Sequence, residues 1–378
     1  MKITDVKVWV VSPGKRNYLY VRIDTDEGIH GIGEAYSCGP DLATAKCIEY
    51  FKDWIVGLDP LKPEYIWARL FNYSRFPGGC IVNSAISGID LALWDIMGKA
   101  ANMPVYQLMG GPTRDKIQVY EDTHAPTPEA LVEEVQKLQE EQGYKAIKVF
   151  QSFNADLSAQ DIIDGLVASY KMLRDKIGYQ LEMGVDFHAR NFEPFRAKWY
   201  ADAIKEYRPF FIEEPIRPDN FKQMAILKKN FPAPLATGEC LYTKYEFNDL
   251  IQMDAADILQ PDVLLTGGLT ESKKIAAMAE ANYKVIAPHN PLSPLSTAIN
   301  VHYAASIPNF LILEHVRDDR PDRKDLLEEY LPVKDGYIEL PTKPGWGVEL
   351  NYEYLETLEY KTWTRNFSVR GDGSVDVV

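Results

Sequence analysis

The sequence is poor in cysteine, and its cysteines are not paired along the chain. Four occur in 378 residues, and none forms a CxxC motif. A zinc ribbon, a disulfide framework or a dithiol redox site is therefore not expected. We expect reduced, buried thiols and a cytoplasmic protein, since free thiols are typical of reducing compartments. The cysteines are Cys38, Cys47, Cys80 and Cys240.

Long apolar runs, an excess of basic residues and a glycine-rich phosphate loop are also missing. No run approaches the roughly 20 apolar residues of a membrane span, and the N-terminal MKITDVKVWVV alternates charged and apolar residues, unlike a signal peptide. The formal net charge is −14, whereas nucleic acids and anionic membranes bind basic surfaces. We therefore expect no nucleic acid and no membrane partner. An anionic small molecule would need a local cation.

Six short apolar segments in the second half of the chain each end in a carboxylate or a histidine. The intervals between these end residues are 27, 26, 23, 27 and 25 residues, which is about what a strand, a helix and two short loops occupy. In a (β/α)8 barrel, parallel strands deliver their C-terminal residues to one face, so these groups are expected to share a pocket. They are Asp186, Glu213, Glu239, Asp262, His289 and Glu314.

The pattern predicts an α/β fold, a (β/α)8-type barrel (modified TIM barrel) with an N-terminal α+β capping domain. A doubly wound sheet is the rival, but it normally carries a glycine-rich loop after its first strand. We expect the cap at residues 1–114, the barrel at 115–336, and a tail, 337–378, that folds back onto the cap. The eight strands are expected to end near Asp122, Phe150, His188, Glu214, Glu239, Asp262, His289 and Glu314.

The cap is expected to open with an antiparallel meander over the first 35 residues, because apolar and polar residues alternate around short turns. Helices are expected at 41–57, 63–76 and 84–100, the last capped by Asn83 or Ser84 and buried in a core. The loops 12–17 and 36–41 are rich in Gly, Pro and Ser. They are either plain turns or lids over a site.

Asp186, Glu213 and Glu239 end three consecutive predicted strands, so their carboxylates should be neighbours. Three like charges in one pocket raise each other's pKa unless a cation neutralises them. Three carboxylate oxygens leave room for water and substrate around an octahedral Mg²⁺. We therefore predict that these three acids bind Mg²⁺. Glu214, next to Glu213, should point to the other side of its strand and support the ligands rather than bind the ion.

Two histidines and a lysine are predicted to complete the chemistry. His188 is two residues past Asp186 and faces the same side. His289 comes next after Asp262 in the strand order, and an Asp beside a His makes a general base. Glu314 could hydrogen-bond a substrate oxygen if protonated, and Lys148 could hold an anionic oxygen. His124, after the first barrel strand, is the other histidine within reach of the pocket.

This arrangement suits removal of a proton next to a carboxylate, because a cation stabilises the charge that develops there. With a 3-hydroxyl on the substrate, a second acid on the opposite face would release water. An aldonate would then become a 2-keto-3-deoxy acid. A cycloisomerase or epimerase using the same site, and a non-catalytic sugar-acid-binding protein, are the alternatives.

In this order, the phrases GVDFH, FIEEP, GEC, ILQPD, APH and PGWGVE resemble the enolase superfamily, in its mandelate racemase subgroup, over essentially the whole chain. DFHAR with APHNPLSP is most similar to the D-galactonate dehydratases and related acid-sugar dehydratases. The resemblance implies Mg²⁺ as cofactor, a galactonate-like substrate and cap loops that set specificity. It also implies a homo-oligomer. The implied roles are His289 as base supported by Asp262, His188 as proton donor, Glu314 and Lys148 in catalysis, and Arg190, His124 and Trp346 in substrate binding.

One departure from the subgroup affects the reaction type. Racemases carry a KxK motif at the second strand, whereas this chain has Lys148, Val149 and Phe150. A racemase that uses the second lysine is therefore not expected, while a dehydratase that uses His188 is unaffected. Mannonate or gluconate dehydration stays open as an alternative.

Overall fold

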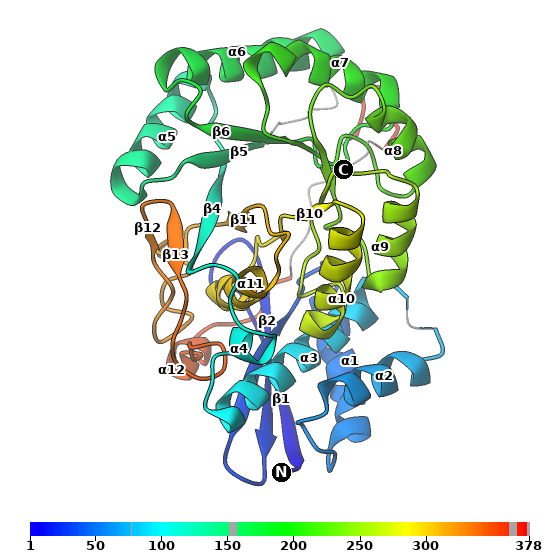
Figure 1. The fold of residues 1–378 in the computed structure, drawn as a ribbon, viewed down its shortest axis with the longest axis vertical. Helices are drawn as coiled ribbons and strands as arrows, with labels where there is room; N and C mark the ends of the chain where they lie inside the picture. Colours follow the sequence, from blue (N-terminus) through cyan, green and yellow to red (C-terminus); the bar gives the residue numbers. More distant parts are fainter. Residues whose placement is uncertain (77, 151–156, 363–368, 376–378) are drawn as a thin grey trace.

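The computed structural model describes residues 1–76, 78–150, 157–362 and 369–375. Figure 1 shows a ring of strands and helices above a smaller body built by the N-terminal elements. The ring is the barrel and the smaller body is the cap. The fold is therefore the capped α/β barrel that the sequence predicts.

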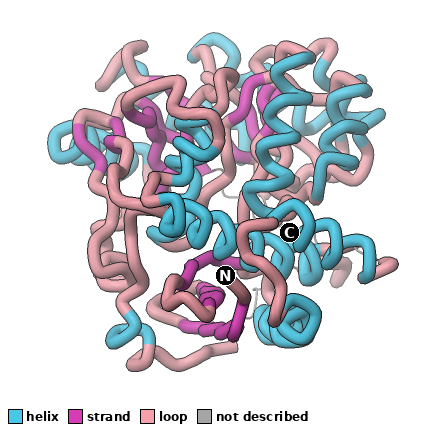
Figure 2. The backbone as a smooth tube through the Cα atoms, turned by 60° about the horizontal axis from the view of Figure 1, so that its bottom comes forward, coloured by secondary structure: helices cyan, strands magenta, loops and turns pink. Residues whose placement is uncertain are grey.

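The cap begins with a three-stranded antiparallel sheet, whose strands pair in chain order, so the predicted meander is confirmed. Alternating apolar residues of the sheet pack against the cap helices in one shared core, and Figure 2 brings this part of the molecule forward. The strands are β1 (Ile3–Val11), β2 (Tyr18–Thr25) and β3 (His30–Ala35). The helices are α1 (Asp41–Ile55), α2 (Pro63–Tyr73), α3 (Cys80–Ala101) and α4 (Val105–Leu108).

Helix α3 is the central helix of the cap and starts one turn earlier than expected. Gly79 is its N-cap, with φ 84°, a conformation that glycine adopts at little cost. The predicted cap at Asn83 or Ser84 is therefore wrong, and both residues are buried inside the helix. By length and composition α3 is able to cross a membrane, but 72% of that window is buried inside the protein. It is a core helix, as the sequence predicts.

Eight parallel strands of the described residues form the barrel, each at a predicted position. From β4 to β10, every strand pairs with the next along the chain. The ring closes because β11 pairs with β4 and Ile286 of β10 bridges Phe310 just before β11. The strands are β4 (Lys116–Thr123), β5 (Ala146–Phe150), β6 (Glu182–Asp186), β7 (Ile212–Glu213), β8 (Leu235–Thr237), β9 (Ile258–Leu259), β10 (Val285–Ile286) and β11 (Leu313–His315).

A helix follows each strand from β4 to β10, and together these helices cover the outside of the ring (Figure 1). Hydrogen-bonding side chains cap the starts of two of these helices: the Thr127 hydroxyl accepts from the backbone N–H of Ala130, and Ser158 with Asp161 forms a capping box. The helices are α5 (Pro128–Gln142), α6 (Ala159–Lys176), α7 (Pro194–Ile204) with a 3-10 turn at Lys205–Tyr207, α8 (Phe221–Lys228), α9 (Thr243–Gln252), α10 (Gly268–Ala281) and α11 (Pro294–Ser306).

The chain after the barrel contacts both domains. β12 (Val333–Lys334) and β13 (Tyr337–Glu339) form a hairpin whose second strand pairs with β4 of the barrel. Farther along, the Trp346 backbone N–H donates to Asp95 of α3, and α12 (Tyr352–Leu355) follows. The predicted boundary after residue 336 thus falls inside the hairpin. Residues 363–368 and 376–378 of the tail lie outside the described residues, and the domain limits stay a prediction.

The cysteines are more accessible than expected. Cys38, Cys47 and Cys80 are partly buried and Cys240 is exposed. The expectation of fully buried thiols is wrong, because these residues lie in the loop before α1, in α1, at the start of α3 and in the loop after β8 rather than in barrel strands.

Candidate active site

The C-terminal ends of the barrel strands bring the predicted polar residues to one face of the ring. Apart from Glu239, which is partly exposed, these side chains are buried. They are Lys148 in β5, Asp186 at the end of β6, Glu213 at the end of β7, Glu314 in β11, and Glu239, Asp262 and His289 just after β8, β9 and β10.

The Lys148 ammonium lies at the centre of the acidic residues. Its Nζ is 3.0 and 3.1 Å from the two carboxylate oxygens of Glu213 and 2.8 Å from Oε1 of Glu314. Asp122 and Asp186 lie 3.5 and 3.7 Å away. Burial by itself would lower the pKa of Lys148, but the surrounding carboxylates raise it well above its ordinary value. The lysine is therefore a fixed positive charge that links carboxylates from four strands.

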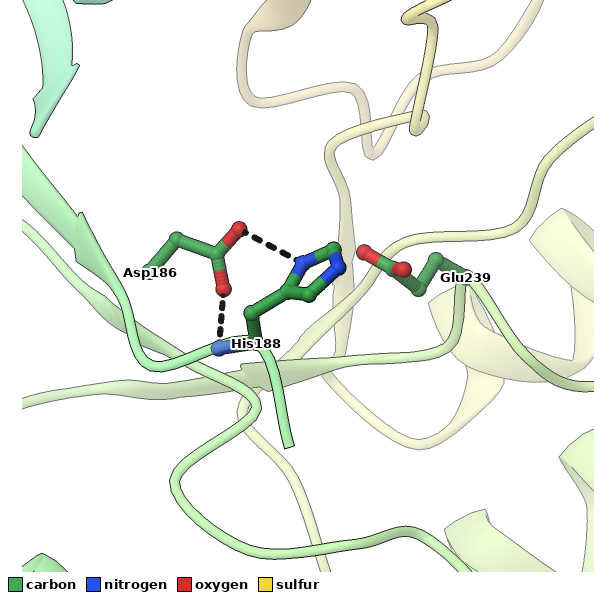
Figure 3. Close-up of side chains that lie close together, drawn as sticks. All are labelled: Asp186, His188 and Glu239. Carbon is green, nitrogen blue, oxygen red and sulfur yellow. Dashed lines mark hydrogen bonds and ion pairs between the residues drawn. The ribbon is translucent and has the colours of Figure 1, made fainter. Parts of the chain in front are cut away.

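Asp186, His188 and Glu239 lie close enough to share one metal ion (Figure 3). Their ligand atoms are all within 4.8 Å of one another. The His188 backbone N–H donates to Asp186 at 2.6 Å, and His188 Nδ1 is 3.4 Å from the other oxygen of that carboxylate. His188 has φ 50°, a left-handed conformation that directs the chain back toward Asp186. Two of the three predicted metal ligands thus meet here, with His188 between them.

Glu213, the third predicted ligand, joins the same cluster through Lys148. Gln260 donates to its Oε2 at 2.7 Å. Burial raises the pKa of Glu213 to about 8, while Lys148 acts in the opposite direction. A crowded set of carboxylate oxygens fits a hard divalent cation, because oxygen atoms are the ligands that Mg²⁺ prefers. The ligand set itself stays a prediction.

Glu214 lies close to Glu239 and Cys240. It is buried with φ 39°, and its carboxylate lies within 4.8 Å of ligand atoms of Glu239 and Cys240. Burial and the charges of Glu239 and Asp186 raise its pKa well above the ordinary value. The prediction that Glu214 acts behind the metal ligands stays a prediction.

His289 and Asp262 form the predicted dyad. His289 Nδ1 is 2.8 Å from Oδ2 of Asp262, whose other oxygen accepts from the Leu264 N–H at 2.8 Å. The second ring nitrogen, Nε2, is 3.5 Å from Glu239 and 4.0 Å from Glu314. Burial would lower the pKa of His289, but those two carboxylates raise it well above its ordinary value. One imidazole nitrogen is thus held by Asp262 and the other is directed into the acidic cluster.

Glu314 accepts hydrogen bonds on both of its carboxylate oxygens. Its Oε1 accepts from Lys148, and its Oε2 accepts from the backbone N–H of Asn290 at 2.7 Å. Burial opposes ionisation, but Lys148 and His289 lower the pKa of Glu314 to about 2. These contacts favour the ionised carboxylate, and the hydrogen bond that a protonated Glu314 could make to substrate stays a prediction. Asn290 was not singled out in the sequence, although it directly follows His289.

The three predicted substrate-binding residues have different surroundings. His124 is exposed overall, but partial burial of its ring and the nearby charge of Lys148 lower its pKa. The charges of Asp186 and His188 act on it as well. Arg190 is partly buried two residues beyond His188. Trp346 is fully buried in the core and donates from its indole to the Ile32 carbonyl. With 0% of its surface exposed, Trp346 offers no contact to a ligand in this structure, which does not support the binding role predicted for it.

The cap also contributes to the site. Tyr36, just after β3, places its ring 6.0 Å from the His289 ring, centroid to centroid. Its hydroxyl accepts from Arg16, in the loop between β1 and β2. The two glycine- and proline-rich loops of the sequence thus meet beside His289 through Arg16 and Tyr36.

Family models match nearly the whole chain. The mandelate racemase / muconate lactonizing enzyme N-terminal domain matches residues 2–110, and the enolase C-terminal domain-like model matches residues 130–355. The chain belongs to the enolase superfamily, in its mandelate racemase / muconate lactonizing enzyme family. It is an enzyme of the carbon-oxygen lyase class, a hydro-lyase with a capped barrel.

Particular relatives fit this class. The chain is 34% identical over 387 residues to a D-galactonate dehydratase of Variovorax paradoxus (strain S110), covering 99% of each chain. It is also 34% identical over 362 residues to a D-galactonate dehydratase of Pectobacterium atrosepticum, covering 94% of each. A crystal structure of an Agrobacterium radiobacter enolase, described as a candidate galactarate dehydratase with sodium and L-malate bound, matches with a TM-score of 0.95 and 37% identity over 100% of both chains.

Proposed function

We propose that the protein is a Mg²⁺-dependent acid-sugar dehydratase that acts on a galactonate-like sugar acid. It would remove the C2 proton and eliminate the 3-hydroxyl as water, giving a 2-keto-3-deoxy acid. The observation that carries this proposal is that two imidazoles, from β6 and β10, reach the same carboxylate, Glu239. The names of the relatives support the substrate class.

Asp186, Glu213 and Glu239 are the residues that would hold the metal. Bound there, Mg²⁺ would supply positive charge to the substrate carboxylate and make its α-proton more acidic. Glu239, the carboxylate that does most to raise the pKa of His289, is also one of the proposed metal ligands. Occupancy of the cluster by a cation and deprotonation of His289 are therefore linked.

His289 is suited to be the base. Its Nδ1 is 2.8 Å from Asp262, so a neutral ring keeps its proton on that nitrogen and presents Nε2 as the acceptor. Nε2 would take the C2 proton as the C2–H bond breaks. Asp262 holds the ring in this orientation and stabilises the imidazolium that results.

His188 is suited to be the acid. Its ring lies beside Asp186 and is partly exposed, with 34% of the side chain accessible. The electron pair of the C2–H bond would form the C2–C3 double bond while the C3–O bond breaks. His188 would give its proton to the departing hydroxyl, which leaves as water. The resulting enol becomes the 2-keto-3-deoxy acid.

A screen of aldonic and aldaric acids with Mg²⁺, read out as 2-keto-3-deoxy product, tests the proposal. We expect turnover with at least one galacto-configured acid, and a loss of roughly 10²–10⁴-fold in kcat for either His289→Asn or His188→Asn. His30→Asn is the control, because His30 pairs with Glu349 of the tail, away from this cluster. Absence of product with every acid sugar would contradict the proposal.

The alternatives give different outcomes in the same assays. An epimerase would exchange C2 hydrogen with solvent deuterium without releasing water, and a mannonate or gluconate dehydratase would select those acids in the screen. A non-catalytic binding protein would bind the acid with His289→Asn unchanged. Homo-oligomer formation and a cytoplasmic location stay predictions.

A further inference from the structure

Arg16 is a partly buried arginine of the cap whose charge has no acidic partner. Its Nη2 donates to the Tyr36 hydroxyl at 2.9 Å, and its guanidinium carbon lies 5.3 Å from the centre of that ring. Its Nε is buried without a hydrogen-bond partner. Among the described residues, no carboxylate forms an ion pair with it. A guanidinium that keeps donors unsatisfied in a protein of net charge −14 is unusual.

The position of Arg16 relates it to the base. The Tyr36 ring lies 5.3 Å from the guanidinium carbon and 6.0 Å, ring to ring, from His289. Asp262 of the dyad is close enough for its charge to act on Arg16. Tyr36 thus contacts both the guanidinium and the ring of the base. The guanidinium therefore belongs to the cap side of the candidate site, whereas the acidic cluster belongs to the barrel strands.

A buried polar network fixes the loop that carries Arg16. The neighbouring Asn17 donates to Asp41 of α1 at 2.8 Å and to the carbonyl of Lys361 in the tail at 3.0 Å. Ser12 donates to Asn17 and accepts from the Lys361 backbone N–H. The Ser37 hydroxyl donates to the second oxygen of Asp41 at 2.9 Å. Both cap loops and the tail are thus tied together, so Arg16 is held in place before any substrate binds.

The distribution of charge indicates what Arg16 binds. Lys148 is already surrounded by four carboxylates, so it is poorly placed to take up a second anionic group of the substrate. The carboxylate next to C2 is directed to the metal cluster at the barrel end. An anionic group at the other end of the substrate would meet a guanidinium with unsatisfied donors, and Arg binds carboxylates through paired N–H donors.

We propose that Arg16, positioned by Tyr36, binds a second carboxylate at the distal end of the substrate, so that the enzyme prefers an aldarate to the aldonate of the same configuration. This rests on the proposed dehydratase function and narrows its substrate class. A diacid is also the chemistry of L-malate, bound in the structure of the Agrobacterium radiobacter relative. Tyr36 acts here as a positioning residue.

Galactarate and galactonate form a matched pair of substrates, since they differ in the group at C6. With Mg²⁺ present, we expect the wild-type protein to have a kcat/KM at least tenfold higher for galactarate. Arg16→Met should remove most of this preference by raising KM for the diacid, and Arg16→Lys should restore part of it. Tyr36→Phe should give an intermediate loss. Lys15→Met is the control, because Lys15 is an exposed neighbour in the same loop, and it should leave the ratio unchanged.

A binding measurement separates failure of this proposal from failure of the dehydratase function. By calorimetry with Mg²⁺, L-malate should bind at least tenfold more tightly than L-lactate, which lacks the second carboxylate, and Arg16→Met should abolish the difference. Turnover of galactonate without galactarate, or equal effects of Arg16→Met on both acids, would overturn the role of Arg16 while leaving the dehydratase standing. If neither acid is turned over, the ratio of the affinities for L-malate and L-lactate still decides. A ratio that is the same in Arg16→Met as in the wild type overturns the proposal.

Discussion

Replacing Lys148 with methionine removes a buried positive charge that four carboxylates surround. Methionine keeps much of the apolar stem but leaves Glu213 and Glu314, which both hydrogen-bond to Nζ, without their cation. Removing one partner of a buried ion pair costs about 3–5 kcal/mol, because the remaining charge is left uncompensated. We expect the metal-free variant to lose this much unfolding free energy, a large share of the 5–15 kcal/mol typical of domains.

Magnesium should offset part of this loss. A ligand that binds only the folded state stabilises it by about 2.7 kcal/mol at 100 times its Kd. In Lys148→Met the ion would enter carboxylates that no longer have a neighbouring ammonium, so its stabilising effect should be larger than in the wild-type protein. Urea unfolding in excess Mg²⁺ and in excess EDTA measures how much free energy of unfolding Mg²⁺ adds to each of the two proteins.

The control is Lys171→Met, which removes an exposed lysine paired with Asp175 on α6. Exposed pairs contribute roughly 0–1 kcal/mol, so this variant should unfold almost like the wild-type protein in either buffer. If Lys148→Met lost less than about 1 kcal/mol in EDTA, the lysine would not be compensating the acids. If Mg²⁺ stabilised the variant no more than the wild type, the metal would not lie beside Lys148.

Two further predictions concern stability away from the site. Burial lowers the pKa of His302 to about 4 from an ordinary 6.5; its Nδ1 accepts from the Tyr106 N–H and its Nε2 donates to the Trp346 carbonyl. Between these pH values the unfolded chain binds a proton that the folded chain does not, so stability should fall by roughly 3 kcal/mol as pH drops through this range. Plotted against pH, the urea midpoint should fall less steeply on the acid side in His302→Gln than in the wild type. Equal slopes in the two proteins would refute the assignment. Thr127→Ala removes the N-cap hydroxyl that accepts from Ala130 and should cost about 1 kcal/mol with unchanged kcat; an unchanged urea midpoint would contradict it.

The sequence could predict the barrel because its signals are local. Apolar runs at regular intervals specified the strands, and the acids and histidines at their ends specified which side chains share a face. Asp262 and His289 are an example, since Oδ2 of the first lies 2.8 Å from Nδ1 of the second. This works because every parallel strand of a closed ring points the same way, so the position of a residue along its strand determines where its side chain lies.

Tertiary packing alone decided the charge state and the cap side of the site. Lys148, from a strand distant in sequence, donates to Glu314 and lowers its pKa, and no local pattern reports such a neighbour. Arg16 and Tyr36 meet beside His289 across more than 250 residues of chain. Trp346 is part of the phrase PGWGVE that resembles the family, yet its side chain lies in the core. The sequence by itself therefore determined which residues the strands present, while the packing of cap against barrel determined their partners and charges, because those depend on contacts between segments far apart in the chain.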